Sequence, residues 1–257
     1  MKKIVALLLA AMMIVCCCSA LAEETKPLAG RTLKIALSPN FMYFETVSED
    51  DPNAYEGLDI DIIAKLSEML GFDYEIVPMD FASLIGSLQT GNADFVISGL
   101  SYSDERAQVV DFSMTYCTTD VGCVVPVDSD IQTTSDLIGK VVCCSAGTTY
   151  ETLLTAMDVN LKTFNGQAAV GTAVAEGTDN VAAGVTSING SKKLANTVLD
   201  TEGNPMLRYF MLEGEGTADS YNIAFTKGSE LTAIFDEAIQ AMIDSGELAE
   251  MIQYWLY

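Results

Sequence analysis

Strand-length apolar segments alternate with helix-period segments along this chain, and this alternation restricts the fold more than any other feature. In the first half we predict strands over 32–37, 72–77 and 94–97 and helices over 58–70 and 81–88. A second strand that follows a helical crossover lies parallel to the first. The sequence therefore predicts an α/β fold with a mostly parallel sheet.

The same alternation begins again in the second half of the chain. We predict strands over 140–144, 161–164 and 180–185 and helices over 149–157 and 168–176. The segment 190–216 has no clear period apart from a strand at 207–212, so the rest of it is predicted to be irregular. We also predict a strand over 221–225 and helices over 231–243 and 247–255. The two series of alternating elements imply two α/β lobes.

The beginning of the chain has the composition of an export sequence. Lys2 and Lys3 precede the apolar stretch 4–15. Small residues, Ala20 and Ala22, then stand at the positions that a signal peptidase requires before its cut. A membrane-spanning helix needs about 20 apolar residues, more than this stretch provides. Residues 1–22 are therefore predicted to be a secretory signal peptide that is cut after Ala22, with lipidation at one of the cysteines 16–18 as the alternative.

Charge and composition exclude several functions. The chain has 13 Lys and Arg against 36 Asp and Glu, a formal net charge of −23, and no His. The negative charge repels nucleic acids and anionic lipid surfaces. Without His, the chain lacks the Ser-His and Cys-His catalytic pairs and the commonest transition-metal ligand. We expect no nucleic-acid partner, no metal and no cofactor.

Four cysteines remain after the predicted cleavage, namely Cys117, Cys123, Cys143 and Cys144. They could pair in three ways, and the sequence does not choose among them. The neighbouring Cys143 and Cys144 lie in an apolar run, which indicates a buried strand where cysteine packs as a small hydrophobic residue.

The segment 98–106 is the first candidate for binding chemistry, because it follows the strand predicted over 94–97. Ligands of open parallel sheets bind beyond the carboxyl ends of the strands. Gly99 permits close approach of the backbone, and Ser103 is a suitable N-cap for a short helix that begins near Arg106. Arg106 could bind an anion there, or it could form a surface ion pair with a nearby aspartate.

Seven motifs, in matching order and spacing, resemble the polar amino-acid family of bacterial solute-binding proteins, the extracytoplasmic receptors of ABC importers. They lie at 55–61, 84–94, 103–106, 110–116, 136–142, 146–149 and 222–228 and cover nearly the whole chain after the signal peptide. The resemblance implies a periplasmic-binding-protein type 2 fold, with two α/β lobes joined by two hinge crossings.

The resemblance also implies lobe boundaries. The first lobe would comprise residues 29–117 plus 222–257, and the second lobe residues 118–221. The hinge would lie near 117–120 and 218–222.

By the same resemblance, Arg106 would bind the α-carboxylate of a ligand, and a guanidinium has the parallel donors for this. Ser101 matches the hydroxyl position that assists Arg106. Ser98 and Gly99 match positions near the α-ammonium group.

Further positions of the resemblance complete the expected site. Phe41 matches the aromatic residue that stacks on the ligand side chain, with plain core packing as the alternative. Thr148 and Thr149, which follow Gly147, match second-lobe donors that reach the carboxylate on closure. Their alternative role is to begin a helix without contacting a ligand.

Two positions depart from the family pattern. Gly184 stands where the family usually has an acid that pairs with the ligand ammonium, so that Asp179 or another acid replaces it, or the ligand is not an ordinary α-amino acid. Ser38 stands where receptors of basic amino acids and glutamine usually have Asp. A ligand with a long cationic side chain is therefore not expected.

The expected function is that of the substrate-binding component of an ABC importer, which closes on a small carboxylate ligand such as an amino acid. We expect a monomer without enzymatic activity, periplasmic or extracellular, with a membrane permease as partner and lipid anchoring as an alternative. A cyclohexadienyl dehydratase-like enzyme, with Glu45 as the nominated acid, and an extracellular ligand sensor are the other candidates on this fold.

Overall fold

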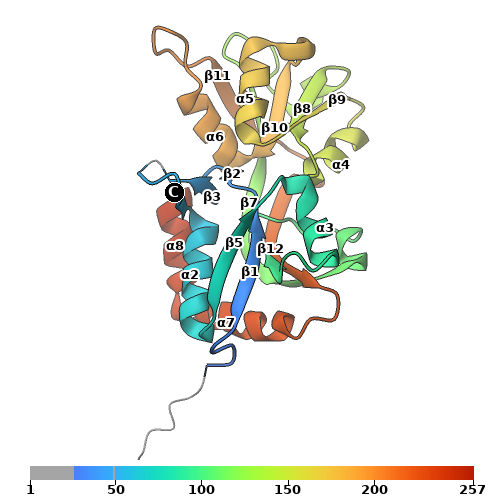
Figure 1. Ribbon diagram of the computed structural model, residues 1–257. Coiled ribbons are helices and arrows are strands. Elements are labelled where there is room, and N and C mark those ends of the chain that lie inside the picture. The colour runs from blue at the N-terminus through green and yellow to red at the C-terminus, as the bar shows by residue number, and fades with distance from the viewer. Residues whose placement is uncertain (1–25, 49) are drawn as a thin grey trace, which may run out of the picture.

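The computed structural model describes residues 26–48 and 50–257, so the predicted signal peptide lies outside the described residues. The chain forms two α/β lobes, one above the other in Figure 1, with extended strands passing between them. No helix in the described part is long and apolar enough to cross a membrane.

The first lobe is built on the parallel strands β5 (Asp73–Pro78), β1 (Thr32–Leu37) and β6 (Phe95–Val96). Helices α2 (Leu58–Leu70), α7 (Leu231–Ser245) and α8 (Glu247–Leu256) pack together beside this sheet, and the short α3 (Leu84–Gln89) lies elsewhere on it (Figure 1). The predictions of these elements are confirmed, with small shifts of the ends.

Helix α2 shows how the sequence determines a local element. Leu58, Ile62, Ile63 and Leu66 recur at helical spacing and are fully buried in the core of the first lobe. Gly71 ends the helix with a positive φ of 83°, and its N–H donates to the carbonyl of Ser67.

A small antiparallel sheet, which the sequence analysis did not predict, lies at the edge of the first lobe that faces the second. It comprises β2 (Asn40–Phe41), β3 (Glu45–Val47) and β4 (Tyr55–Glu56). Its strands have two or three residues each, too short for a periodic pattern to be visible in the sequence.

Two strands connect the lobes. The 17-residue β7 (Val110–Pro126) pairs with β12 (Ala218–Thr226) along its first part and with strands of the second lobe along its last part. The register runs from Ala218 opposite Asp120 to Tyr221 opposite Cys117, and irregularities follow directly after Tyr221.

In the sheet of the second lobe, β7 is followed in order by β10 (Ala183–Ser187), β8 (Val141–Ser145) and β9 (Asn160–Phe164). Strand β11 (Leu207–Met211) also pairs with β7. Helices α4 (Thr149–Ala156), α5 (Gln167–Glu176) and α6 (Ile188–Thr197) surround this sheet (Figure 1). Cys143 and Cys144 are fully buried in β8, as predicted, and all four described cysteines are free thiols.

Helix α6 corrects the prediction that the chain is irregular from residue 190. Ser187 caps the helix by accepting a hydrogen bond from the N–H of Gly190 at 3.1 Å. The buried face of α6 consists largely of small residues, including Gly190 and Ser191, which approach neighbouring elements closely. Small residues do not give the apolar period from which helices are predicted, so the sequence did not reveal this one.

Candidate ligand-binding cleft

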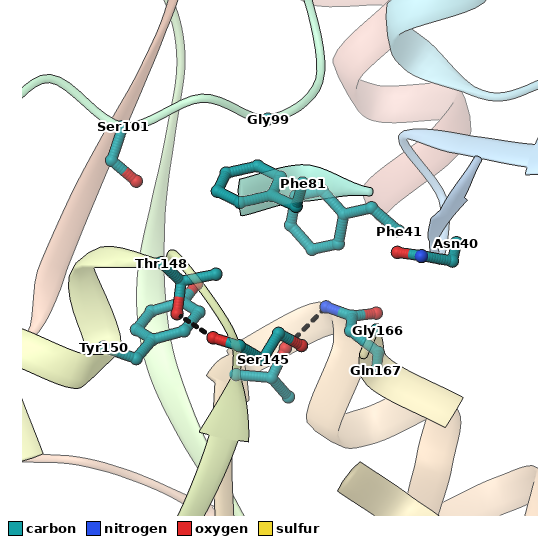
Figure 2. A pocket seen from close by; sticks show the side chains of 11 residues that line it. Asn40, Phe41, Phe81, Gly99, Ser101, Ser145, Thr148, Tyr150, Gly166 and Gln167 are labelled. Atoms are coloured by element: carbon teal, nitrogen blue, oxygen red, sulfur yellow. Dashed lines mark hydrogen bonds between the residues drawn. The ribbon is translucent and has the colours of Figure 1, made fainter. Parts of the chain in front are cut away.

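A cleft lies between the two lobes. Both lobes contribute to its walls, as Figure 2 shows. The lining residues are Asn40, Phe41, Phe81, Gly99, Ser101, Ser145, Thr148, Tyr150, Gly166, Gln167 and Thr186. Of the expected site residues, Phe41, Gly99, Ser101 and Thr148 are therefore in the wall of the cleft.

Arg106 bridges the two lobes beside this cleft. It begins a short 3-10 helix (Arg106–Gln108), where its backbone N–H donates to Ser103 Oγ at 3.2 Å. Its Nη1 donates to the carbonyl of Ser101 at 2.6 Å, and its Nη2 donates to the carbonyl of Gly147 in the second lobe at 2.8 Å. Its guanidinium carbon lies 5.7 Å from the centre of the Phe81 ring.

The alternative in which Arg106 forms a surface ion pair does not match this geometry. Asp111 pairs instead with Lys227 at 2.8 Å, and Asp104 accepts a hydrogen bond from Tyr102. Burial lowers the pKa of Arg106, while the charges of Asp219 and Glu105 oppose this change. The guanidinium is thus held between the lobes, with carbonyl oxygens as its partners.

A chain of hydroxyl contacts lies beside the cleft. Thr149 Oγ1 lies 3.3 Å from Ser101 Oγ and 3.5 Å from Asp219 Oδ1. Thr148 is the N-cap position of α4, and its hydroxyl donates to the carbonyl of Ser145 at 2.7 Å. Thr149 thus reaches Ser101 of the first lobe and Asp219 in the connecting strand β12, whereas the hydroxyl of Thr148 is used within its own lobe.

Gly99 and Phe41 depend on each other sterically. Gly99 has a φ of +50°, and a Cβ atom at this position would lie 2.1 Å from Cε1 of Phe41. The Phe41 ring stacks on Phe44 with their centroids 4.6 Å apart and meets Tyr221 edge to face. Phe41 therefore packs on the core and lines the cleft at the same time.

Ser98 lies behind the wall of the cleft, where its hydroxyl donates to Glu45 Oε1 at 2.5 Å. Asp59, beside Glu45, accepts hydrogen bonds from the N–H of Gly99 at 2.7 Å and from the hydroxyl of Tyr116 at 2.8 Å. Burial raises the pKa of Asp59 to about 6, and burial and the Asp59 charge raise the pKa of Glu45 well above its ordinary value. These two acids support the wall and do not line the cleft.

Gln167, which no sequence pattern had indicated, connects the lobes. Its Oε1 accepts a hydrogen bond from the N–H of Met42 at 3.2 Å, and its Nε2 donates to Thr186 Oγ1 (Figure 2). Gln167 follows Gly166 at the start of α5. No local pattern distinguishes such a glutamine from one on a helix surface, because its partners come from distant parts of the chain.

The structure corrects the interpretation of Gly184. This glycine lies inside β10 opposite Val124 and Cys143, and a Cβ there would meet Val170 and Val174 in the core. Further along the same strand, Thr186 lines the cleft instead.

Asp179, the other acid considered for the ligand ammonium, is exposed in a 3-10 turn. Its Oδ2 lies 3.5 Å from Nζ of Lys162. Asp179 therefore does not line the cleft.

Comparisons with known proteins agree with this architecture. Residues 33–257 match the profile of the bacterial extracellular solute-binding proteins, family 3. The arginine-binding extracellular protein ArtP of Bacillus subtilis (strain 168) is 31% identical over 208 residues, which is 77% of each chain. A probable histidine-binding protein of Neisseria gonorrhoeae is 26% identical over 225 residues, which is 85% of this chain and 80% of the relative.

Among solved structures, the amino acid ABC transporter substrate-binding protein AbpA of Streptococcus pneumoniae, bound to L-arginine, aligns with a TM-score of 0.78 and 31% identity. The alignment covers 88% of this chain and 94% of AbpA. An ancestral amino acid-binding protein, described as a precursor of cyclohexadienyl dehydratase, aligns with a TM-score of 0.77 and 25% identity, over 88% of this chain and 96% of that one.

These neighbours confirm the two-lobed type 2 periplasmic-binding fold, and the relatives are named as binding proteins rather than enzymes. With the profile match extending over nearly all described residues, the chain belongs to the bacterial extracellular solute-binding proteins of family 3.

Proposed function

We propose that this protein is the exported substrate-binding component of an ABC importer and that it closes its cleft on a small amino acid without chemical turnover. The observation that carries the proposal is the position of Arg106, which extends from the first lobe to the carbonyl of Gly147 in the second. A group held at this point contacts both lobes and therefore couples binding to closure.

The chemistry of Arg106 favours a carboxylate ligand. Its guanidinium can donate two parallel hydrogen bonds to one carboxylate. In the structure, the carbonyl oxygens of Ser101 and Gly147 accept these hydrogen bonds. Ser101 and Thr149 place hydroxyl groups beside it, one from each lobe. Gly147 belongs to the same second-lobe segment, and Gly99 and Phe41 shape the opposite wall.

The composition of the wall favours a ligand side chain without charge. Of the described residues that line the cleft, none is Asp, Glu, Lys or Arg. The lining includes the amides of Asn40 and Gln167 and the hydroxyls of Ser145 and Thr186. A charged side chain would lose its hydration here without an opposite charge beside it, so we expect uncharged amino acids to bind best.

The hinge is proposed to lie where β7 and β12 run side by side between the lobes, near 117–120 and 218–222. Residues 29–117 with 222–257 and residues 118–221 would then rotate as two bodies. The irregular pairing that follows Tyr221 supports this position, because interrupted pairing permits bending. The protein would act as a monomer that delivers its ligand to a membrane permease, in the periplasm or on a lipid anchor.

Thermal unfolding with the common L-amino acids tests the function, since a bound ligand raises the melting temperature. Wild type should respond to one or more uncharged amino acids, and Arg106→Ala should lose the response. A hydrogen bond from the guanidinium to a ligand carboxylate contributes about 1.5–3 kcal/mol to binding. Arg106→Ala should therefore bind the ligand at least about tenfold more weakly than wild type.

Arg31→Ala is the matched control, because Arg31 forms an exposed ion pair with Glu230 at 3.0 Å. This variant should keep the full response. An unchanged response in Arg106→Ala, or no response of wild type to any amino acid, would contradict the proposed function.

A further inference from the structure

An α-amino acid carries an ammonium group beside its carboxylate. None of the described residues that line the cleft is an acid that could pair with this group, and the lining residue on β10 is Thr186. Building on the proposed function, we propose that Asp219, on the connecting strand β12, supplies the negative charge that recognises the α-ammonium group.

Asp219 does not line the cleft itself, but it adjoins residues that do. It is two residues before Tyr221 on β12, so both side chains point to the same face of the sheet. The hydroxyl of Tyr221 lies 3.5 Å from that of Tyr150, which lines the cleft. The Asp219 carboxylate itself adjoins the hydroxyls of Thr149, Ser101 and Tyr150. Two of these three neighbours, Ser101 and Tyr150, are lining residues.

The carboxylate of Asp219 is incompletely satisfied. The residue is only 8% exposed, and its Oδ2 atom is buried without a hydrogen-bond partner among the described residues. Buried carboxylate oxygens are normally paired, so an unpaired one next to a cleft indicates a missing donor. An ammonium group has three N–H donors and the opposite charge.

Arg106 and Asp219 together match the charges of an amino acid. No salt bridge of 4.0 Å or less joins them in the described part of the chain, and Arg106 is directed at carbonyl oxygens. Nevertheless, each charge affects the pKa of the other group, and burial raises the pKa of Asp219. Ser101 contacts both groups, Arg106 through its carbonyl and Asp219 through its hydroxyl.

The arrangement therefore places a positive and a negative side chain next to the same lining residue, Ser101. An amino acid whose α-carbon lies over Ser101 would direct its carboxylate to Arg106 and its ammonium group to Asp219. The other buried acids near the cleft, Glu45 and Asp59, lie behind the wall with Ser98 and Gly99 as partners.

The test compares each common L-amino acid with the carboxylate that lacks only its α-amino group, for example serine with 3-hydroxypropanoate and glutamine with glutaramate. Affinities are measured by calorimetry for wild type and for Asp219→Asn, which keeps the shape of the side chain. We expect wild type to prefer the amino acid of a bound pair by about tenfold or more. Asp219→Asn should remove most of this preference and leave the affinity for the des-amino carboxylate nearly unchanged.

Asp120→Asn is the control, because Asp120 is an exposed acid on the neighbouring strand β7 and loses the same charge. A purely structural role of Asp219 would weaken both members of each pair equally, and this result would overturn the inference. Equal binding of both members by wild type would overturn it without any variant. If amino acids bind and require Arg106 while the preference survives in Asp219→Asn, the proposed function stands and this inference fails. Binding of no probe overturns both.

Discussion

Gly99→Ala tests how closely the cleft wall depends on backbone geometry. The new methyl group would lie 2.1 Å from Cε1 and 2.4 Å from Cδ1 of Phe41. Ordinary contacts begin at 3.4 Å, so the ring would have to move by more than 1 Å. Phe44 and Tyr221 hold the ring in place by stacking and edge contacts. The methyl group therefore cannot be accommodated without disturbing the aromatic cluster.

The cost has two parts. A left-handed conformation with a φ of +50° costs an alanine about 1–2 kcal/mol. Overpacking of a buried contact adds about 1–3 kcal/mol. We therefore expect Gly99→Ala to lower the free energy of unfolding by about 2–5 kcal/mol. Urea unfolding measures this loss, and the fluorescence of Trp255, the single tryptophan of the chain, reports on the first lobe.

Gly91→Ala is the matched control, since Gly91 has a φ of +71° and no described atom within 4 Å of the added Cβ. It should cost only the backbone part, about 1–2 kcal/mol. In a Phe41→Ala background, Gly99→Ala should likewise cost only the backbone part, which gives a coupling of about 1–3 kcal/mol in a double-mutant cycle. If Gly99→Ala costs no more than Gly91→Ala, or if the coupling is absent, the steric reasoning is refuted.

Three further predictions follow from other contacts. Burial raises the pKa values of Glu45 and Asp59, so the folded state binds more protons than the unfolded state. The free energy of unfolding should therefore fall as pH rises through about 6. Glu45→Gln should reduce this fall, and urea unfolding between pH 5 and 8 measures it. Gly147→Ala would bring a Cβ within 2.8 Å of the Ala82 backbone across the cleft and should weaken the ligand-induced melting shift, whereas Gly139→Ala, with no described atom within 4 Å, should not. Burial raises the pKa of Cys143 to about 12, so thiol titration at pH 8 should detect it only after unfolding.

A specific result would contradict each of these predictions. A pH profile that is the same in wild type and Glu45→Gln would show that the buried pair does not titrate in this range. An equal ligand response in Gly147→Ala and wild type would show that the lobes need not approach at this point. Rapid labelling of Cys143 in the folded protein would contradict its burial in β8.

The sequence revealed most of the regular framework. Helix α2 and strand β1 follow directly from apolar periodicity, and Gly71 and Gly246 mark helix ends because they adopt positive φ. Ser103 and Arg106 were found from their position after a predicted strand. The structure begins the short helix at Arg106, whose N–H donates to Ser103 Oγ, although Glu105 and not Ser103 stands at the N-cap position. Such local features depend on residues that are close in sequence.

Other features were decided only by tertiary structure. The sequence predicted that position 184 faces the ligand. In the folded sheet, Gly184 faces the core and Thr186 of the same strand lines the cleft. Gln167 and Asp219 have no local signature, since their partners lie far away along the chain. Helix periodicity and capping act over a few residues and are therefore visible in the sequence. Strand register and lobe contact join distant segments, so which side chains meet in the cleft is known only once the chain has folded.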